Sequence, residues 1–385
     1  MASPSPSLWV WFVVVLAAIH TSSVSALSSS RSRCFRAIYS FGDSLADTGN
    51  NYYDTNTLSI ALHLPYGETF FHHPTGRCSD GRLIVDFIAE QMGVPLLKPY
   101  VGIKNGKINS WNPTAEGVNF AVAGATAMDS SYYLGKGIYN IATNYTLGVQ
   151  LNWFKDLLPS ICASPSECKE LLGRSLFLVG EIGGNDFNHP LFLRKSVEEL
   201  RTYVPDVINE ISSAITKLID FGAQTLIVPG NLPIGCNYIY LSMFKTEDVE
   251  AYDEIGCLRW LNRFAEYYNK QLYAEINRLQ VLHPNVNIIY ADYYHAALQI
   301  YQSPKQYGFT ESLLSACCPP LDLPNKSEGS IDCGKPGGVV CDNPSQYISW
   351  DGLHLTEAAY KLIAKGLLNG PYTNPRIASS CDSQI

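Results

Sequence analysis

The 385-residue sequence contains no apolar run long enough to cross a membrane as a helix. The N-terminal run from Leu8 to Ile19 has about a dozen residues, whereas a spanning helix needs about 20. Small and polar residues ending in Val24-Ser25-Ala26 follow it, which is typical of a cleavable secretory signal, although no Lys or Arg precedes the run. We expect residues 1–26 to be a signal peptide, with a buried N-terminal helix as the alternative, and the mature chain to have no stable membrane insertion.

Clusters of Lys and Arg are also missing, and the formal net charge is -8. A surface that binds phosphate backbones needs concentrated positive charge, so we expect no nucleic-acid partner. No C-x-x-C pair and no Cys/His pair has the spacing of a zinc site. No internal repeat or low-complexity linker follows the signal, so residues 27–385 should form a single domain.

The sequence is rich in hydrophobic residues, at 46%, and has eleven cysteines, all beyond the signal. In a secreted protein most cysteines should be disulfide-bonded, and an odd number leaves at least one thiol unpaired or bonded to another chain. The sequence leaves the pairing open, but three groups lie close along the chain: Cys162 with Cys168, Cys236 with Cys257, and Cys317, Cys318, Cys333 and Cys341 together. Asn144 and Asn325 begin N-glycosylation sequons.

Short apolar runs alternate with amphipathic segments along the chain. Strands are predicted over 37–41, 118–122, 176–181, 225–228 and 286–290, and helices over 81–92, 147–158, 197–221, 260–282 and 356–368. Pro205 should kink or split the long helix over 197–221. This alternation favours a mostly parallel sheet covered on both faces, in which ligands bind beyond the carboxyl ends of the strands.

Three glycine-containing segments follow predicted strands. The first, Gly42-Asp43-Ser44, places a serine at the mouth of the sheet. In the second, Gly124 can bring a backbone N–H close to a ligand. In the third, Asn185 can offer a side-chain N–H to an oxyanion. Taken alone, each segment is as well or better explained as a structural turn.

A serine nucleophile needs a base and a group that orients the base, and Asp-x-x-His supplies both. This motif occurs three times, as Asp186 to His189, Asp292 to His295 and Asp351 to His354. Asp292 resembles a helix N-cap with His295 in the first turn. The Asp186 pair overlaps the glycine-rich Asn185 turn, whereas the Asp351 pair lies in a loop before the last helix. The motif itself does not choose among the three pairs.

Taken in order, these blocks resemble the plant GDSL esterase/lipase family of the SGNH hydrolases. The blocks are Phe41-Gly42-Asp43-Ser44 with Asp47-Thr48-Gly49-Asn50, Asn119-Phe120-Ala121 to Gly124-Ala125, Gly183-Gly184-Asn185-Asp186, and Asp351-Gly352-Leu353-His354. Connecting stretches such as Pro65-Tyr66-Gly67 are similar too. The likeness extends from about Cys34 to Leu368.

The resemblance implies a flavodoxin-like three-layer α/β/α sandwich with about five parallel strands. It implies that Ser44 is the nucleophile, His354 the base and Asp351 the residue that orients His354. The oxyanion hole would consist of the backbone N–H groups of Ser44 and Gly124 and the side chain of Asn185. No metal or organic cofactor is implied.

The function predicted from these residues is hydrolysis of a small-molecule carboxylic ester through an acyl-enzyme. The chain is most similar to the subgroup that contains acetylajmalan esterase and sinapine esterase, which implies acetyl or hydroxycinnamoyl esters of plant specialised metabolites. Two alternatives remain: acyl transfer to an alcohol by the same residues, and a catalytically silent modifier on the same fold. We expect a monomer in the secretory pathway, with an extracellular or vacuolar destination.

Overall fold

The structure is a computed structural model that describes Met1 and residues 34–54, 60–112, 114–139, 142–310, 314–320, 333–335 and 338–377. The predicted signal peptide and the sequon at Asn325 lie outside the described residues. The chain divides into two units, Met1–Ser32 and Arg33–Ile385, and every described helix and strand belongs to the second. None of the described helices combines the length and the apolar character needed to cross a membrane.

A six-stranded sheet forms the centre of the second unit. Its strands are β1 (Ile38–Phe41), β2 (Gly117–Asn119), β3 (Leu176–Val179), β4 (Thr225–Pro229), β5 (Asn287–Ala291) and β6 (Thr373–Asn374), in the order β2-β1-β3-β4-β5-β6. The first five are parallel, as predicted, and β6 adds a two-residue antiparallel edge to β5. Because β2 and β3 flank β1, the strand order reverses beside β1, and such a reversal opens a ligand crevice in this class of sheet.

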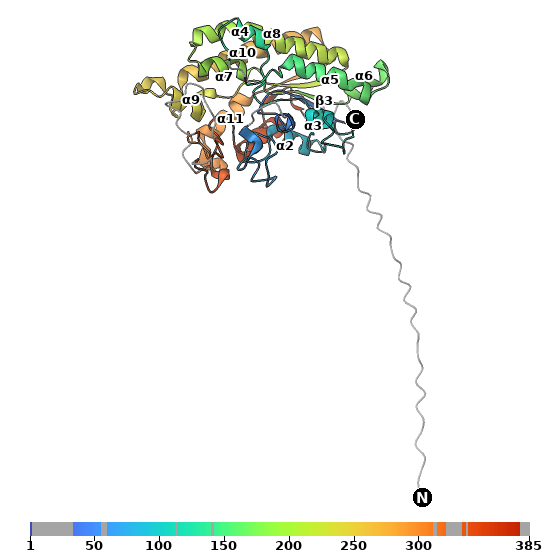
Figure 1. The fold of residues 1–385 in the computed structure, drawn as a ribbon, viewed down its shortest axis with the longest axis horizontal. Helices are drawn as coiled ribbons and strands as arrows, with labels where there is room; N and C mark the ends of the chain where they lie inside the picture. Colours follow the sequence, from blue (N-terminus) through green and yellow to red (C-terminus); the bar gives the residue numbers. More distant parts are fainter. Residues whose placement is uncertain are drawn as a thin grey trace. The chain divides into compact units, whose positions relative to one another are not determined.

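Helices cover both faces of the sheet, which confirms the three-layer α/β/α fold. On one side lie α5 (Leu147–Ile161), α7 (Gly184–Phe192), α8 (Val197–Phe221) and α10 (Arg259–Leu282). The other side carries α2 (Ile84–Gln91), α11 (Tyr293–Gln302) and α12 (Glu357–Asn369). Figure 1 shows α5, α8 and α10 above the strands and α2 and α11 below them.

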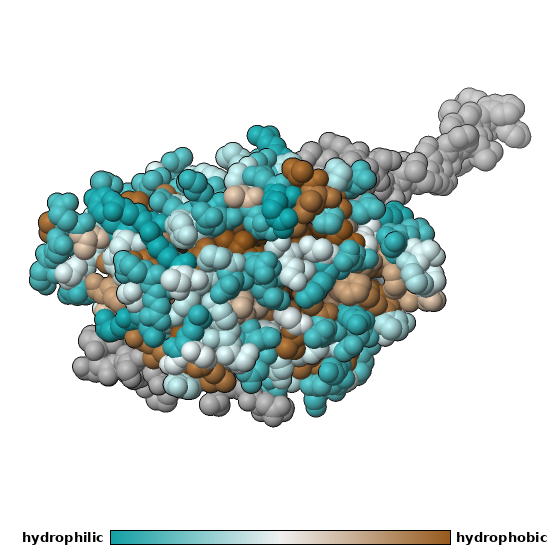
Figure 2. Space-filling view, turned by 90° about the horizontal axis from the view of Figure 1, so that it is seen from above, coloured by the Kyte–Doolittle hydropathy of each residue, from teal (hydrophilic) through white to brown (hydrophobic). Residues whose placement is uncertain are grey.

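Each layer has its own hydrophobic core, and the strands contribute to both. Tyr39 and Phe177 point into the core under α5 and α8, whereas Ile38 and Leu178 point into the core under α2 and α12. Successive strand residues face opposite sides, so strands covered on both faces are apolar throughout. Figure 2 looks down on the α8 and α10 layer, whose outer face is mostly hydrophilic with smaller hydrophobic areas.

The remaining described helices are short. They are α1 (Asn50–Tyr53), α3 (Tyr100–Lys104), α4 (Ser130–Leu134), α6 (Pro165–Gly173) and α9 (Tyr238–Met243), with single-turn 3₁₀ helices over Ile60–Leu62, Ile234–Cys236, Val249–Ala251, Pro304–Tyr307 and Pro344–Gln346. They lie in the segments that connect the strands and the long helices.

The structure differs from the prediction in two helices. Pro205 does not split α8, which runs unbroken from Val197 to Phe221. Pro205 and Arg201, whose carbonyl the proline leaves without its helical donor, are both exposed, so water can satisfy that carbonyl. The segment around Asn185, expected to be a turn, begins the unpredicted helix α7.

Four disulfides join cysteines that lie close in the sequence. They are Cys162–Cys168, Cys236–Cys257, Cys317–Cys341 and Cys318–Cys333. Cys34 is also disulfide-bonded. Within the part of the chain that the structure describes, Cys78 is the free thiol, and it is buried. The expectation of an unpaired cysteine is therefore confirmed.

Candidate active site

A small pocket lies where the carboxyl ends of β1, β3 and β4 meet. Its volume is about 30 Å³, and its lining includes Ser44 after β1, Glu181 and Asn185 after β3, Asn231 after β4, and His354. The five residues come from four separate parts of the chain, and the parallel sheet brings three of those parts to one edge. The site therefore lies in the crevice that the strand order opens beside β1.

A chain of two hydrogen bonds joins the predicted nucleophile, base and orienting residue. Ser44 Oγ lies 2.8 Å from His354 Nε2, and His354 Nδ1 lies 2.7 Å from Asp351 Oδ2. All three side chains are buried, and Ser44, the most accessible, is 8% exposed. The Nδ1 contact with a carboxylate sets the tautomer in which Nε2 can accept the serine proton.

Asp351 is held as a carboxylate by several donors. The backbone N–H groups of Leu353 and His354 donate to Oδ1, and the Tyr66 hydroxyl donates to Oδ2 at 2.8 Å. Burial acts to raise the pKa of Asp351, but the His354 ring and these hydrogen bonds outweigh it and hold the pKa below its usual range. A carboxylate that stays ionised keeps His354 aligned toward Ser44.

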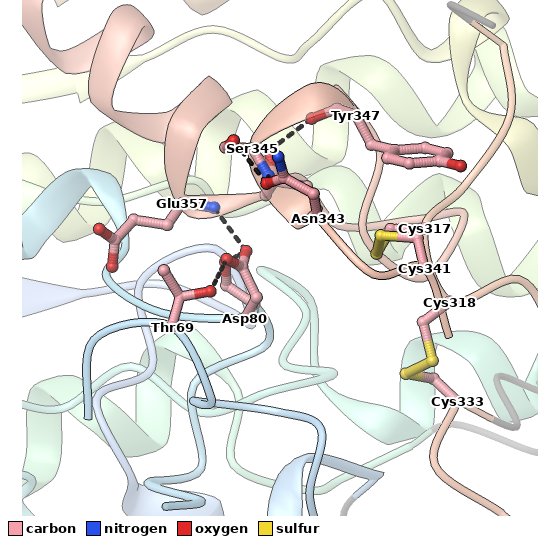
Figure 3. Close-up of a disulfide and its surroundings, with 12 residues drawn as sticks. Thr69, Asp80, Cys317, Cys318, Cys333, Cys341, Asn343, Ser345, Tyr347 and Glu357 are labelled. Atoms are coloured by element: carbon pink, nitrogen blue, oxygen red, sulfur yellow. Dashed lines mark hydrogen bonds between the residues drawn. A yellow bond between two sulfur atoms is a disulfide. The ribbon is translucent and has the colours of Figure 1, made fainter. Parts of the chain in front are cut away.

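The loop that carries Asp351 and His354 is anchored on both sides. Before it, Cys317 N donates to Ser349 O and Cys318 N donates to Trp350 O, which ties it to two disulfides. After it, Asp80 accepts the backbone N–H of Glu357, the first residue of α12 (Figure 3). Thr356 caps this helix, since Thr356 Oγ1 accepts from the N–H of Ala359.

Asn185 enters the pocket from the first turn of α7. Its side-chain N–H₂ donates to Asp43 Oδ2 at 3.1 Å and to Ala125 O at 3.0 Å, and its Oδ1 accepts from Asn188 Nδ2. These contacts fix which end of the amide faces the nucleophile. Phe187 and Leu191, both buried in the core below, hold the helix in place.

Gly124 lies in the turn that precedes Ala125 and has a φ of +83°. A Cβ at this position would lie 2.4 Å from the Cβ of Ala142, so a side chain would displace the turn. Asp47 fixes the other end of the turn, because its Oδ2 accepts from the N–H of Ala123. Gly124 does not line the pocket but joins it through its neighbour Ala125, which accepts from Asn185.

The other two Asp-x-x-His pairs do not reach Ser44. His295 bonds Asp292 at 2.7 Å, but its side chain is 61% exposed and lies in a separate surface pocket beside β5 and α10. Burial lowers the pKa of His189 to about 4, and this ring packs near the Gly124 backbone. Asp186 instead accepts from the N–H groups of Ala127 and Met128 and from a tyrosine hydroxyl.

Sequence analysis missed several residues that support this site. Tyr66 belongs to a stretch that resembles the family but carries no sign of its role, and neither Asn188 nor Glu181 lies in a motif that points to catalysis. Asp47 accepts from the backbone N–H groups of three residues that start α1 and from Ala123, which is why the stretch after Ser44 needs it. The signal that could have identified it is an aspartate two residues before Gly49, since such an aspartate commonly accepts from the backbone N–H two residues on.

Two other kinds of site, a metal site and the predicted glycosylation site at Asn144, do not alter this arrangement of the pocket. Among the residues that the structure describes, no group of three or more His, Cys, Asp or Glu side chains could hold a metal ion. Asn144 is exposed on the segment before α5, where its Oδ1 accepts from Ser130 Oγ at 2.6 Å.

Comparisons with known proteins agree with the sequence motifs. The family model described as GDSL-like Lipase/Acylhydrolase matches residues 38–367. Three Arabidopsis thaliana proteins, each named as a GDSL esterase/lipase, are similar over most of their length. One is 52% identical over 92% of this chain and 89% of its own, a second 51% identical over 92% and 90%, and a third 49% identical over 99% and 98%.

Proposed function

The chain belongs to the GDSL-like lipase/acylhydrolase family and is a carboxylic ester hydrolase, and we propose that it cleaves its substrate through an acyl-enzyme on Ser44. The observation that carries this proposal is the continuous hydrogen-bond chain from Ser44 Oγ through His354 to Asp351, at 2.8 and 2.7 Å. It places a base within reach of a hydroxyl proton, which is the first requirement for nucleophilic catalysis by serine.

In the proposed mechanism, His354 Nε2 takes the Ser44 proton as Oγ attacks the ester carbonyl. The tetrahedral oxyanion accepts hydrogen bonds from Ser44 N–H, Gly124 N–H and the Asn185 amide, and such donors stabilise the transition state by several kcal/mol. The intermediate expels the alcohol, which takes the proton from His354, and leaves the acyl group on Ser44. His354 then deprotonates a water that attacks the acyl-enzyme, and the acid leaves as the proton returns to Ser44.

The pocket supports a small and polar substrate. Four asparagines (Asn185, Asn188, Asn231 and Asn237) and four aliphatic side chains (Leu45, Leu232, Ile234 and Leu353) line it. Amide groups can hydrogen-bond the hydroxyl, ether and carbonyl oxygens of a polar ester. This lining fits the acetyl or hydroxycinnamoyl esters that the resemblance to acetylajmalan esterase and sinapine esterase implies.

A screen of purified protein against acetyl, hydroxycinnamoyl and long-chain acyl esters tests the substrate class. We expect kcat/KM for an acetyl or a hydroxycinnamoyl ester of a polar alcohol to exceed that for the long-chain ester by about tenfold or more, since a few misfitting methylenes cost this much. The same alcohol is used throughout, so that only the acyl group changes. Faster turnover of the long-chain ester would contradict the proposed substrate class.

We propose that the signal segment at residues 1–26 directs the chain into the secretory pathway, with an extracellular or vacuolar destination. We propose further that the mature protein is a monomer and has no nucleic-acid partner. The four described disulfides support this, because disulfides persist in oxidising compartments.

Expression in a secretory host should yield a mature N-terminus at about Leu27 and glycans on Asn144 and Asn325. N-terminal sequencing and mass spectrometry before and after glycosidase treatment measure both. Asn144→Gln should remove one glycan mass and Asn325→Gln another, with Asn188→Gln as a control outside any sequon. Secreted protein that still begins at Met1, or that keeps its full glycan mass in both variants, would disprove this processing.

A further inference from the structure

We infer that Asp43 and Glu181 share a single proton beside Ser44, and that Glu181 is thereby a positioning residue that keeps the Asn185 amide available to the oxyanion. This inference rests on the proposed function, because it concerns the donor that the mechanism assigns to Asn185. The mechanism proposed above gives no role to either carboxyl group.

Both carboxyl groups are buried in the wall of the same pocket. Asp43 is 2% exposed and Glu181 is 4% exposed, and both line the pocket with Ser44 and His354. The N–H of Asp43 donates to the carbonyl of Glu181 at 3.0 Å, which holds the two residues side by side across the ends of β1 and β3. Their side chains also lie within hydrogen-bond contact of each other.

Two carboxylates in such contact cannot both stay ionised at neutral pH, because neither burial nor like charge favours the second anion. Burial, and then the neighbouring Glu181 carboxyl, raise the pKa of Asp43, and burial raises the pKa of Glu181. The hydrogen bond between the two side chains raises the pKa of Asp43 and acts to lower that of Glu181, so the proton lies toward Asp43, which also accepts N–H bonds from Leu45 and Asn185. The pair therefore holds one proton and one negative charge.

The shared proton matters because both N–H groups of the Asn185 amide already donate hydrogen bonds within the protein. One N–H of its amide donates to Ala125 O and the other to Asp43 Oδ2, while Asn188 holds the amide oxygen. To reach an oxyanion, the second N–H must turn partly away from Asp43. With one proton on the pair, the negative charge on Asp43 is reduced and this bond is easily exchanged.

Loss of the shared proton should slow the reaction in two ways. A full carboxylate on Asp43 would bind the Asn185 N–H more tightly, and two adjacent anions would oppose the negative charge that develops on the substrate oxygen. Turnover should therefore fall at alkaline pH as the pair loses its proton.

The other titratable groups that face the pair do not produce the same alkaline change. They are His354, Asp186, Cys78, Tyr240, Tyr268, Tyr293 and Tyr360. Burial raises the pKa of the Cys78 thiol and of the four tyrosines well above their usual range, so these groups stay neutral. Burial raises the pKa of Asp186 to about 6, so its titration lies on the acid side of neutral pH and not on the alkaline side.

The test is the pH dependence of kcat and KM for wild type, Glu181→Gln and Glu181→Ala on one soluble ester. Glutamine can donate to Asp43 as the shared proton does, but it leaves one ionisable carboxyl. We expect Glu181→Gln to retain turnover at neutral pH and to lose the alkaline fall in kcat, because the single remaining carboxyl, without a like-charged neighbour, has a lower pKa than in the pair. Glu181→Ala should lose kcat by up to about a hundredfold with little change in KM, as when an oxyanion donor is lost.

Asp292→Asn, at the exposed pair beside β5, is the matched control and should keep the wild-type profile. Thermal unfolding of each variant distinguishes a loss of turnover from a loss of folding. If Glu181→Ala does not fold, the isosteric Glu181→Gln variant still tests the inference. A wild-type profile without an alkaline fall, or a Glu181→Gln profile identical to wild type, would overturn the inference. Neither result would contradict the proposed function, which would be contradicted only if turnover did not depend on Ser44.

Discussion

Ser44→Ala should remove nearly all ester turnover while leaving the fold and the affinity for substrate almost unchanged. Ser44 Oγ is the atom that forms the acyl-enzyme, and the bond it makes to His354 does not anchor any element of the fold. What remains without it is the contribution of the oxyanion donors and of binding. In one well-studied serine hydrolase, loss of the nucleophile lowers kcat by about a millionfold. Steady-state kinetics and thermal unfolding measure the two quantities.

Ser40→Ala is a matched control for this variant. Ser40 is a buried serine on β1, and within the described part of the chain its hydroxyl has no hydrogen-bond partner. Its replacement should leave turnover nearly unchanged. A fluorophosphonate probe should label wild type and Ser40→Ala on Ser44 and should fail to label Ser44→Ala. Ser44→Ala activity within about tenfold of wild type would show that another residue is the nucleophile.

Burial explains why the five parallel strands could be predicted from the sequence. Strands such as Leu176–Val179 are apolar at every position because both faces are covered by helices. The edge strand Thr373–Asn374 has two polar residues and pairs only with β5, so no periodicity marks it. Strand β2 ends at Asn119, before the predicted Val122, although the N–H groups of Phe120 and Val122 still donate to Ser40 and Gly42.

Helix α7 shows where local propensity is misleading. Its sequence begins with Gly184 and Asn185 and contains Pro190, and these residue types disfavour helices. The helix forms because Phe187 and Leu191, four residues apart on one face, are buried in the core under α8 and α10. Tertiary packing of this kind leaves no signature within a nine-residue segment.

The site could be predicted from the sequence only in part, for a similar reason. The motifs marked Ser44 and Asn185 only as candidates, and both their roles and the choice of Asp351 and His354 among three equivalent pairs needed the family resemblance. Tyr66, which donates to Asp351, lies 285 residues away in the sequence. A single tyrosine carries no sign of such a partner, and only the packing of Tyr66 against Trp350 places it there.

The three Asp-x-x-His pairs differ in what their rings can reach. His354 contacts both Ser44 and Asp351 and is almost fully buried. His295 has an equally short contact with Asp292, but it lies in the exposed first turn of α11, which Asp292 caps, and Tyr290 and Tyr294 rather than a nucleophile surround it. His189 lies one turn beyond Asn185 on α7 and is buried away from the pocket lining.

His354→Ala should therefore cost about as much turnover as Ser44→Ala, because nucleophile and base act as a unit and their effects do not add. His295→Ala should keep most activity, since it removes only a surface contact. His189→Ala should change substrate preference more than rate, because the ring packs beside the Gly124 turn rather than beside Ser44. Asp351→Asn should cost less turnover than His354→Ala, since it disturbs the tautomer and orientation of the base without removing it.

The measurements are kcat and KM for the single variants and for the double variant Ser44→Ala/His354→Ala, whose loss of turnover should match that of either single variant. Substantial activity in His354→Ala, together with its absence in His189→Ala or His295→Ala, would assign the base to the other histidine.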